Sequence, residues 1–437
     1  MIFARRALQS RLDALRQVLA GVVVDELARR FNRPGKDRLA AMWEVVVLHG
    51  LSRHGTIQNE EPLPSGRRPD VRLEDRQLHF TADITTVSDE GLDAANPFSE
   101  LIDLIEKQKS KLKLPIGGLD LKVKPKKVET KRGVRTVLRL PPRNQLETFV
   151  ATEIIPRLRE QIAAGRTILQ IEFEDDKVGL TLTIDPSKAP ISSGNFAAYD
   201  IPTIKDLNPV YSALKAKADQ LRGAKGLTGV IVGDGDCAAL ADRRGLTRAR
   251  ITPQAIADEF LRQYSSVDFV LYLTIEEKRH GWMSATPPER LVRPLLVVRT
   301  GCAAKVQLEA LFTSLISEIP KPVQMPVNGA MRAREPGYQL GHYGGYSMTG
   351  NKIQMSAREF VETLAGIRTL ADNGAKNIEA SRKMPPEHSR LQSFFLRQLK
   401  EGRLPSAITV IKTDSDDSDD WIEFEFGDPD PAISPLR

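Results

Sequence analysis

Two aspartates near the start of the chain have the type and spacing of a metal site. Asp70 precedes a strand-like segment, Val71 to Leu73, and Asp83 interrupts a second one, residues 80–87. Aspartate is a poor β-former and is seldom buried, so its place inside such a run indicates a chemical role. On paired strands the two carboxylates can converge on one point, and convergent carboxylates hold Mg²⁺. We therefore predict a Mg²⁺ (or Mn²⁺) site at Asp70 and Asp83.

A third acid lies in an apolar helical segment upstream. Glu44 is the only charged residue in the ten-residue run 39–48, which belongs to a helix expected over about 37–52. A carboxylate in such a setting needs a partner that offsets its desolvation. A metal is one partner, and an arginine such as Arg67 or Arg68 is the other, so both interpretations stay open.

The two aspartates also carry a resemblance to a known family. Pro69-Asp70 followed by Asp83-Ile84-Thr85 resembles the motif of the PD-(D/E)XK nuclease superfamily, with Thr85 where that family usually has lysine. The resemblance implies a restriction-endonuclease-like α/β fold, a mixed sheet flanked by helices, and metal-dependent cleavage of DNA. It also implies that Glu44 occupies the place of an acid on the helix before the first core strand. Members of similar layout belong to restriction, repair or phage-defence systems.

The missing lysine must be sought elsewhere, because Thr85 can donate a hydrogen bond but supplies no positive charge. In the helix expected over 208–221, the apolar face is formed by Val210, Leu214 and Leu221. Lys217 falls within that face and Gln220 flanks it at about 100° per residue. We predict that Lys217 supplies the displaced cation; the alternative is a lysine that extends along apolar surface. This helix and the strand after it look like the pair that completes the superfamily core.

Positive charge is concentrated between residues 107 and 143. This stretch holds nine lysines and four arginines against Asp120 and Glu129, a local net charge of 13 − 2 = +11. Such a stripe is typical of a surface that binds a polyanion, although a solvated hairpin would have the same composition. The nucleic-acid-binding residues predicted here are Lys122, Lys124, Lys126, Lys127, Lys131, Arg132 and Arg135. Nine acids gather instead within 414–430. One hypothesis is that they compete with nucleic acid for the stripe, and the alternative is an exposed turn that keeps the chain soluble.

Four regions are expected along the chain. Residues 1–90 hold N-terminal helices, the first over 7–30, and the strands of the nuclease core. Residues 91–206 form a basic insertion with two β-hairpins and helices, ending in a Pro/Gly/Ser-rich link from 185. Residues 207–320 complete the α/β core. Residues 321–437 form a smaller α+β region with loops to about 352, two helices, a hairpin (407–412 and 421–426) and the acidic tail.

Composition narrows the class of protein. The 437 residues are 41% hydrophobic and 27% charged, as in soluble globular proteins. No apolar run has the length of a membrane span, and the N-terminus lacks the pattern of a signal peptide, so we expect a cytoplasmic protein with no membrane partner. Two cysteines are too few for a disulfide framework or a zinc knuckle.

The sequence therefore predicts a metal-dependent nuclease that acts on DNA, or on RNA. A catalytically silent nuclease fold that binds nucleic acid or acts as a scaffold subunit is the alternative, because of Thr85. A toxin-like ribonuclease is a third interpretation. The resemblance also allows a homo-oligomer or a partner protein of a defence system.

Overall fold

The computed structural model describes residues 1–76, 78–91, 96–115, 117–130, 133–189, 192–196, 203–240, 251–278, 288–327, 329–334, 346–366, 390–413 and 419–433. Among the helices of these residues, none has the length and apolar character that a membrane crossing requires.

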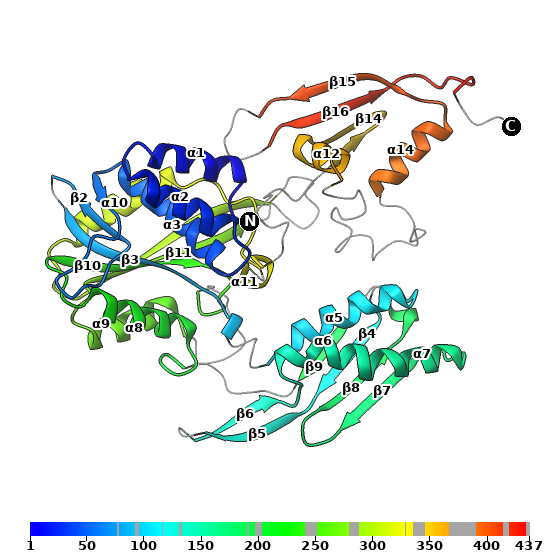
Figure 1. Ribbon diagram of the computed structural model, residues 1–437, viewed down its shortest axis with the longest axis horizontal. Helices are drawn as coiled ribbons and strands as arrows, with labels where there is room; N and C mark the ends of the chain where they lie inside the picture. Colours follow the sequence, from blue (N-terminus) through cyan, green and yellow to red (C-terminus); the bar gives the residue numbers. More distant parts are fainter. Residues whose placement is uncertain are drawn as a thin grey trace.

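A six-stranded mixed sheet is the central layer (Figure 1). In spatial order it consists of β1 (Thr56–Gln58), β2 (Val71–Glu74), β3 (His79–Val87), β10 (Leu227–Asp234), β11 (Phe269–Lys278) and β12 (Glu289–Val298). The first three strands are antiparallel neighbours, β3, β10 and β11 run parallel, and β12 returns antiparallel. Pro294 is tolerated in β12 because an edge strand has one side without a ladder partner. The predicted mixed α/β sheet is confirmed.

Helices cover both faces of this sheet (Figure 1). One face carries α1 (Arg5–Leu15), α2 (Gly21–Asn32), α3 (Asp37–Ser52) and α10 (Lys305–Glu318), and the other carries α8 (Pro209–Leu221) and α9 (Pro253–Gln263). Strand β10 shows the division, because Ile231 packs in the α3 core whereas Val230 and Val232 pack in the α8–α9 core. Such alternation gives a strand that is buried on both faces. The single helix predicted over 7–30 is wrong, since the chain turns at 16–20 and restarts as α2 at Gly21.

A second sheet is formed by residues that lie between β3 and β10 in the sequence. Its strands, in spatial order, are β7 (Leu169–Glu174), β8 (Gly179–Ile184), β4 (Leu119–Val123) and β9 (Ser193–Phe196). Helices α5 (Phe98–Lys111), α6 (Leu146–Phe149) and α7 (Ile155–Ala163) share a core with this sheet, and β5 (Pro125–Thr130) and β6 (Gly133–Leu138) form a separate hairpin. Strand β9 lies in the stretch that we expected to be a link, where it pairs parallel to β4.

The helical stretch over 143–163 contains three kinds of turn. It begins with a 3₁₀ turn, Arg143–Gln145, and a π-helical turn, Val150–Ile154, joins α6 to α7. Pro156 is the second residue after that turn, at the start of α7, and it has no N–H to donate, so the regular α-helical bonding pattern cannot continue through it. A further 3₁₀ turn, Pro186–Lys188, follows β8.

A third sheet is built near the C-terminus. Its strands, in spatial order, are β13 (Tyr346–Thr349), β14 (Lys352–Ser356), β16 (Trp421–Phe426) and β15 (Pro405–Ile411), and its core is shared with α12 (Ala357–Leu364) and α14 (Arg390–Lys400). The predicted loop over 320–352 contains β13 and the short helix α11 (Gly329–Arg332). Asp420 joins this sheet to the N-terminal helix through an ion pair with Arg6, at 3.1 Å.

Candidate active site

Asp70 and Asp83 lie side by side on neighbouring strands. The registered pair of Val71 and Ala82 places Asp70, the residue before β2, opposite Asp83 in the middle of β3. The amide N–H of Asp70 donates to Asp83 Oδ1 at 3.2 Å, and the amide N–H of Ile84 donates to Asp70 Oδ2 at 2.7 Å. The two backbones therefore fix both carboxylates at one place on the sheet.

Strand alternation directs Asp83 away from α3. Ala82 and Ile84 pack in the core that contains α3, so Asp83 between them projects toward the opposite face, which α8 covers. Parallel pairing of Asp83 with Val230 places β10 directly beside it. The acid that interrupts the apolar run of β3 is thus presented toward α8.

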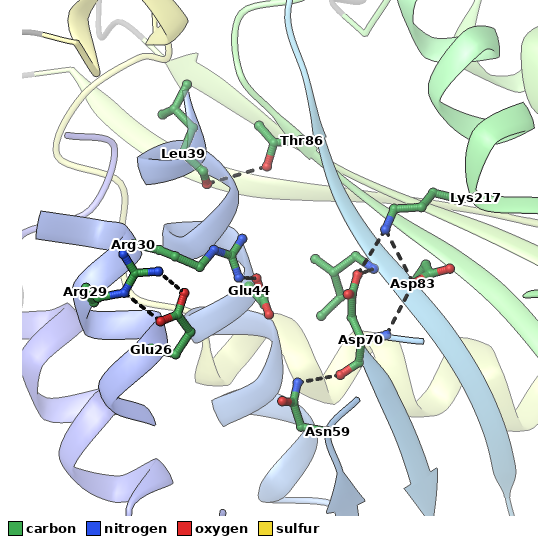
Figure 2. Close-up of polar contacts among 11 residues, drawn as sticks. Glu26, Arg29, Arg30, Leu39, Glu44, Asn59, Asp70, Asp83, Thr86 and Lys217 are labelled. Carbon is green, nitrogen blue, oxygen red and sulfur yellow. Dashed lines mark hydrogen bonds and ion pairs between the residues drawn. The ribbon is translucent and has the colours of Figure 1, made fainter. Parts of the chain in front are cut away.

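Helix α8 brings Lys217 to the two acids, as Figure 2 shows. The helix begins at Pro209 after Asn208, whose side chain accepts hydrogen bonds from the amides of Val210 and Tyr211. Lys217 Nζ lies 3.3 Å from Asp70 Oδ2 and 3.4 Å from Asp83 Oδ1. The side chain of Lys217 is 19% exposed, so its ammonium is held between the carboxylates with little access to solvent.

Two amide side chains fix the segment that precedes Asp70. Gln220 accepts from Lys217 Nζ at 3.0 Å and donates to the carbonyl oxygen of Arg68 at 3.1 Å. Asn59 donates to the carbonyl oxygen of Asp70 at 2.7 Å. The sequence indicated that Gln220 flanks Lys217, but it gave no signal that Asn59 holds the first acid.

Burial dominates the electrostatics of Asp83. Its side chain is 0% exposed, and desolvation raises its pKa to about 7. The charge of Lys217 acts in the opposite direction, and the negative charge of Asp70 adds to the rise. Within the described part of the chain, Asp83 Oδ2 is buried without a hydrogen-bond partner. A buried acceptor of this kind is costly unless something occupies it.

The donor set fits Mg²⁺ or Mn²⁺. Both cations prefer oxygen ligands, and Mg²⁺ is commonly held by one or two carboxylates with water in its other positions. Asp70 and Asp83 would hold the cation, with Asp83 Oδ2 as the oxygen that the protein leaves unpartnered.

Glu44 is directed to a different partner. On α3 it accepts from Arg30 Nη1 of α2 at 2.7 Å, so its arginine is Arg30 rather than the predicted Arg67 or Arg68 (Figure 2). Burial raises the pKa of Glu44 to about 7, an effect that Arg30 opposes and the charge of Asp70 reinforces. Among the described residues no three His, Cys, Asp or Glu side chains are grouped to hold a metal, so Glu44 does not complete a three-acid cluster.

Thr85 lies on the same face of β3 as Asp83, two residues further along, and is half-buried.

A hollow lies beside this part of the sheet, on the side of Asp83 opposite to Thr85. Its lining includes Pro69, which precedes the first acid, Thr81, which precedes Asp83 by two positions, and the exposed Lys225 beyond α8. The lining of the hollow therefore includes a residue one position from Asp70 and a residue two positions from Asp83.

The basic residues belong to a different part of the fold. Lys122 lies on β4, Lys126 and Lys127 lie on β5 and Lys124 joins the two, all apart from the acids (Figure 1). Lys122 forms an ion pair with Asp120 at 3.6 Å, and Lys124 forms one with Glu174. Lys131, Arg132 and the side chain of Arg135 lie outside the described residues.

Comparisons of the chain with protein-family models, curated proteins and solved structures found no match.

Proposed function

We propose that this protein is a metal-dependent nuclease that cleaves phosphodiester bonds of DNA. The observation that carries the proposal is the convergence of Asp70, Asp83 and Lys217, which come from three elements. Lys217 is 147 positions from Asp70 in the chain, yet its ammonium bridges both carboxylates. Two acids and one ammonium at a single point are the groups that phosphoryl transfer requires.

The order of the elements supports the resemblance to the PD-(D/E)XK superfamily. That resemblance calls for a helix before the first core strand, two strands that carry acids, and then a helix and a fourth strand. Helix α3, strands β1 to β3, helix α8 and strand β10 follow this order, and β10 lies beside β3. On this proposal the second sheet and the separate β5–β6 hairpin, which together carry the basic residues, are an insertion in a restriction-endonuclease-like core.

Each side chain has a distinct role in the proposed reaction. Asp70 and Asp83 would hold the cation, which would offset the negative charge of the phosphate and lower the pKa of a bound water. Lys217 donates to the phosphate oxygens and stabilises the negative charge that develops there. The Thr85 hydroxyl orients the water, since it can accept and donate a hydrogen bond. The hollow that Lys225 borders offers a path for the strand next to the scissile phosphate.

Binding of DNA is assigned to the basic residues of β4 to β6. Lys126 and Lys127 contribute charge from the hairpin, and the complete stripe would act through phosphate contacts that do not depend on sequence. An enzyme of this type in a restriction, repair or phage-defence system would work in the cytoplasm.

A silent scaffold is the second candidate, and one observation favours it. Lys217 already pairs with both acids, and Thr85 supplies no second cation. In a protein that only binds nucleic acid, this ion-paired cluster would be a structural element between β3 and α8.

Cleavage assays with Mg²⁺ and Mn²⁺ on duplex DNA, single-stranded DNA and RNA test the proposal. We expect cleavage by the wild type and a loss of at least about a hundredfold in Asp70→Asn and Asp83→Asn. Asp219→Asn is the matched control, because Asp219 lies on α8 but pairs with Arg222 at the surface. DNA binding without cleavage would favour the scaffold, and cleavage of RNA alone would identify a ribonuclease.

A further inference from the structure

The ammonium of Lys217 occupies the position between the two carboxylates. It contacts one oxygen of each acid, at 3.3 and 3.4 Å, and its third contact is the side-chain oxygen of Gln220 at 3.0 Å. A lysine ammonium has three N–H donors, so these three acceptors satisfy it completely. The shortest of the three contacts is to the neutral amide.

A divalent cation bound by the same two carboxylates would lie close to this ammonium. Cations of this type lie about 2 Å from their carboxylate oxygens, which is closer to the acids than Lys217 Nζ. A cation and an ammonium that share the same two carboxylates are close together, and they repel each other strongly where solvent screening is weak. Asp83 is fully buried and Lys217 is largely buried, so screening there is weak.

We infer that Lys217 is a built-in competitor of the divalent cation and that Gln220 retains its ammonium after displacement. This inference rests on the proposed function, because it assumes that Asp70 and Asp83 bind a cation. In the cation-free protein Lys217 offsets part of the negative charge of the acids and holds β3 against α8. When the cation binds, the ammonium leaves the carboxylates and keeps its bond to Gln220, with two N–H donors directed to the phosphate.

Gln220 suits this task because it is anchored independently of Lys217. Its amide nitrogen donates to the carbonyl oxygen of Arg68, in the segment that leads into Asp70. Loss of that bond would leave the displaced ammonium without its neutral acceptor. Gln220 is therefore a positioning residue, which acts on the reaction through Lys217.

Calorimetric titration of the full chain with Mn²⁺ alone tests the inference without any measurement of cleavage. The Lys217 ammonium and Mn²⁺ compete for the same carboxylates, so removal of the ammonium should raise the affinity for Mn²⁺. Coupling between two bound groups typically changes affinity by about 5- to 150-fold. We expect Lys217→Met to bind Mn²⁺ about tenfold tighter than the wild type and Gln220→Leu to bind it several-fold weaker. Lys215→Met is the control: Lys215 is exposed on the same helix, and its removal should leave the affinity unchanged.

The outcomes separate the inference from the function on which it rests. Equal affinity in wild type and Lys217→Met would overturn the competition while leaving the metal site intact. Equal affinity in wild type and Gln220→Leu would overturn the retaining role of Gln220. Absence of Mn²⁺ binding in every variant would overturn the proposed metal site itself. Lys217→Gln, which keeps a polar side chain, replaces Lys217→Met should the methionine variant fail to unfold cooperatively.

Discussion

Arg30 and Glu44 form a close ion pair that does not offset the burial of the acid. Arg30 Nη1 lies 2.7 Å from Glu44 Oε2, yet the pKa of Glu44 is raised to about 7 because desolvation outweighs the charge of the arginine. The ionised form of Glu44 is thus less favourable in the folded chain than in the unfolded one. Its side chain is only 8% exposed, so solvent does little to relieve this cost.

Stability should therefore depend on pH through Glu44. A folded-state pKa above the usual 4.5 means that the folded protein binds the proton more tightly, so stability is lost as pH rises from about 4.5 to about 7. Glu44→Gln removes this effect, and we expect its free energy of unfolding at pH 8 to exceed that of the wild type by about 2 kcal/mol. Urea unfolding at pH 4.5, 6 and 8 measures the difference, with the exposed Glu309→Gln as control. A gap of the same size at every pH would contradict it.

Removal of Lys217 should destabilise the protein most at high pH. Without the ammonium, ionised Asp83 is buried with no opposing charge, and we expect a loss of about 2 kcal/mol at pH 8. The loss should shrink toward pH 5, where Asp83, with a pKa of about 7, is protonated. Urea unfolding of Lys217→Met and of Lys217→Met/Asp83→Asn checks this, since the double variant should recover stability at pH 8. A double variant no more stable than the single one would exclude the charge as the cause.

The basic hairpin should contribute unequally to DNA affinity. Lys122 and Lys124 have acidic partners, so their charges are partly neutralised, whereas Lys126 and Lys127 lie on strand β5 of the hairpin. We expect Lys126→Gln/Lys127→Gln to reduce the slope of log K against log salt by about 2, from the loss of two phosphate contacts. Lys122→Gln/Lys124→Gln should reduce it less. Fluorescence anisotropy over a salt series measures both slopes, and an unchanged slope in the first pair would assign the hairpin to solubility.

Acids of the C-terminal region should stabilise their own sheet rather than compete for DNA. Asp419 pairs with Arg358 at 2.6 and 2.8 Å, and Asp420 pairs with Arg6, whereas we had predicted that the acids of this region face the basic stripe. Asp414, Asp416 and Asp417 lie outside the described residues. We expect Asp419→Asn to lower the free energy of unfolding by about 1 kcal/mol with DNA affinity unchanged. Higher DNA affinity at low salt would restore the competition model.

Local patterns were sufficient to predict the pair of acids and the lysine. Asp70 and Asp83 lie on two segments joined by a short turn, which favours pairing of β2 with β3, and the helical angle of Lys217 is fixed by α8 alone. The prediction of Lys217 also used the resemblance to the nuclease superfamily, which places this distant helix against the strands that carry the acids.

The parts that could not be predicted depend on how distant elements pack. Arg30 reaches Glu44 only because α2 crosses α3, and no spacing in the sequence specifies that crossing. Strand β9 was missed because Ser193 and Gly194 have low strand propensity, and its pairing with β4 provides the stability. Strand β13 was missed for a similar reason: it follows a glycine-rich stretch of sequence, and its pairing with β14 in a hairpin provides the stability.

The position of the second sheet in the chain has a consequence for synthesis on the ribosome. Strand β3 emerges early, but its parallel neighbour β10 and the lysine on α8 follow only after the whole second sheet has been made. A contact between residues 147 positions apart has a high closure entropy and forms late in folding. A nascent chain therefore presents both acids without their counter-ion until α8 has left the exit tunnel. The aspartate pair therefore receives its counter-ion in one late event, which couples completion of the site to completion of the fold.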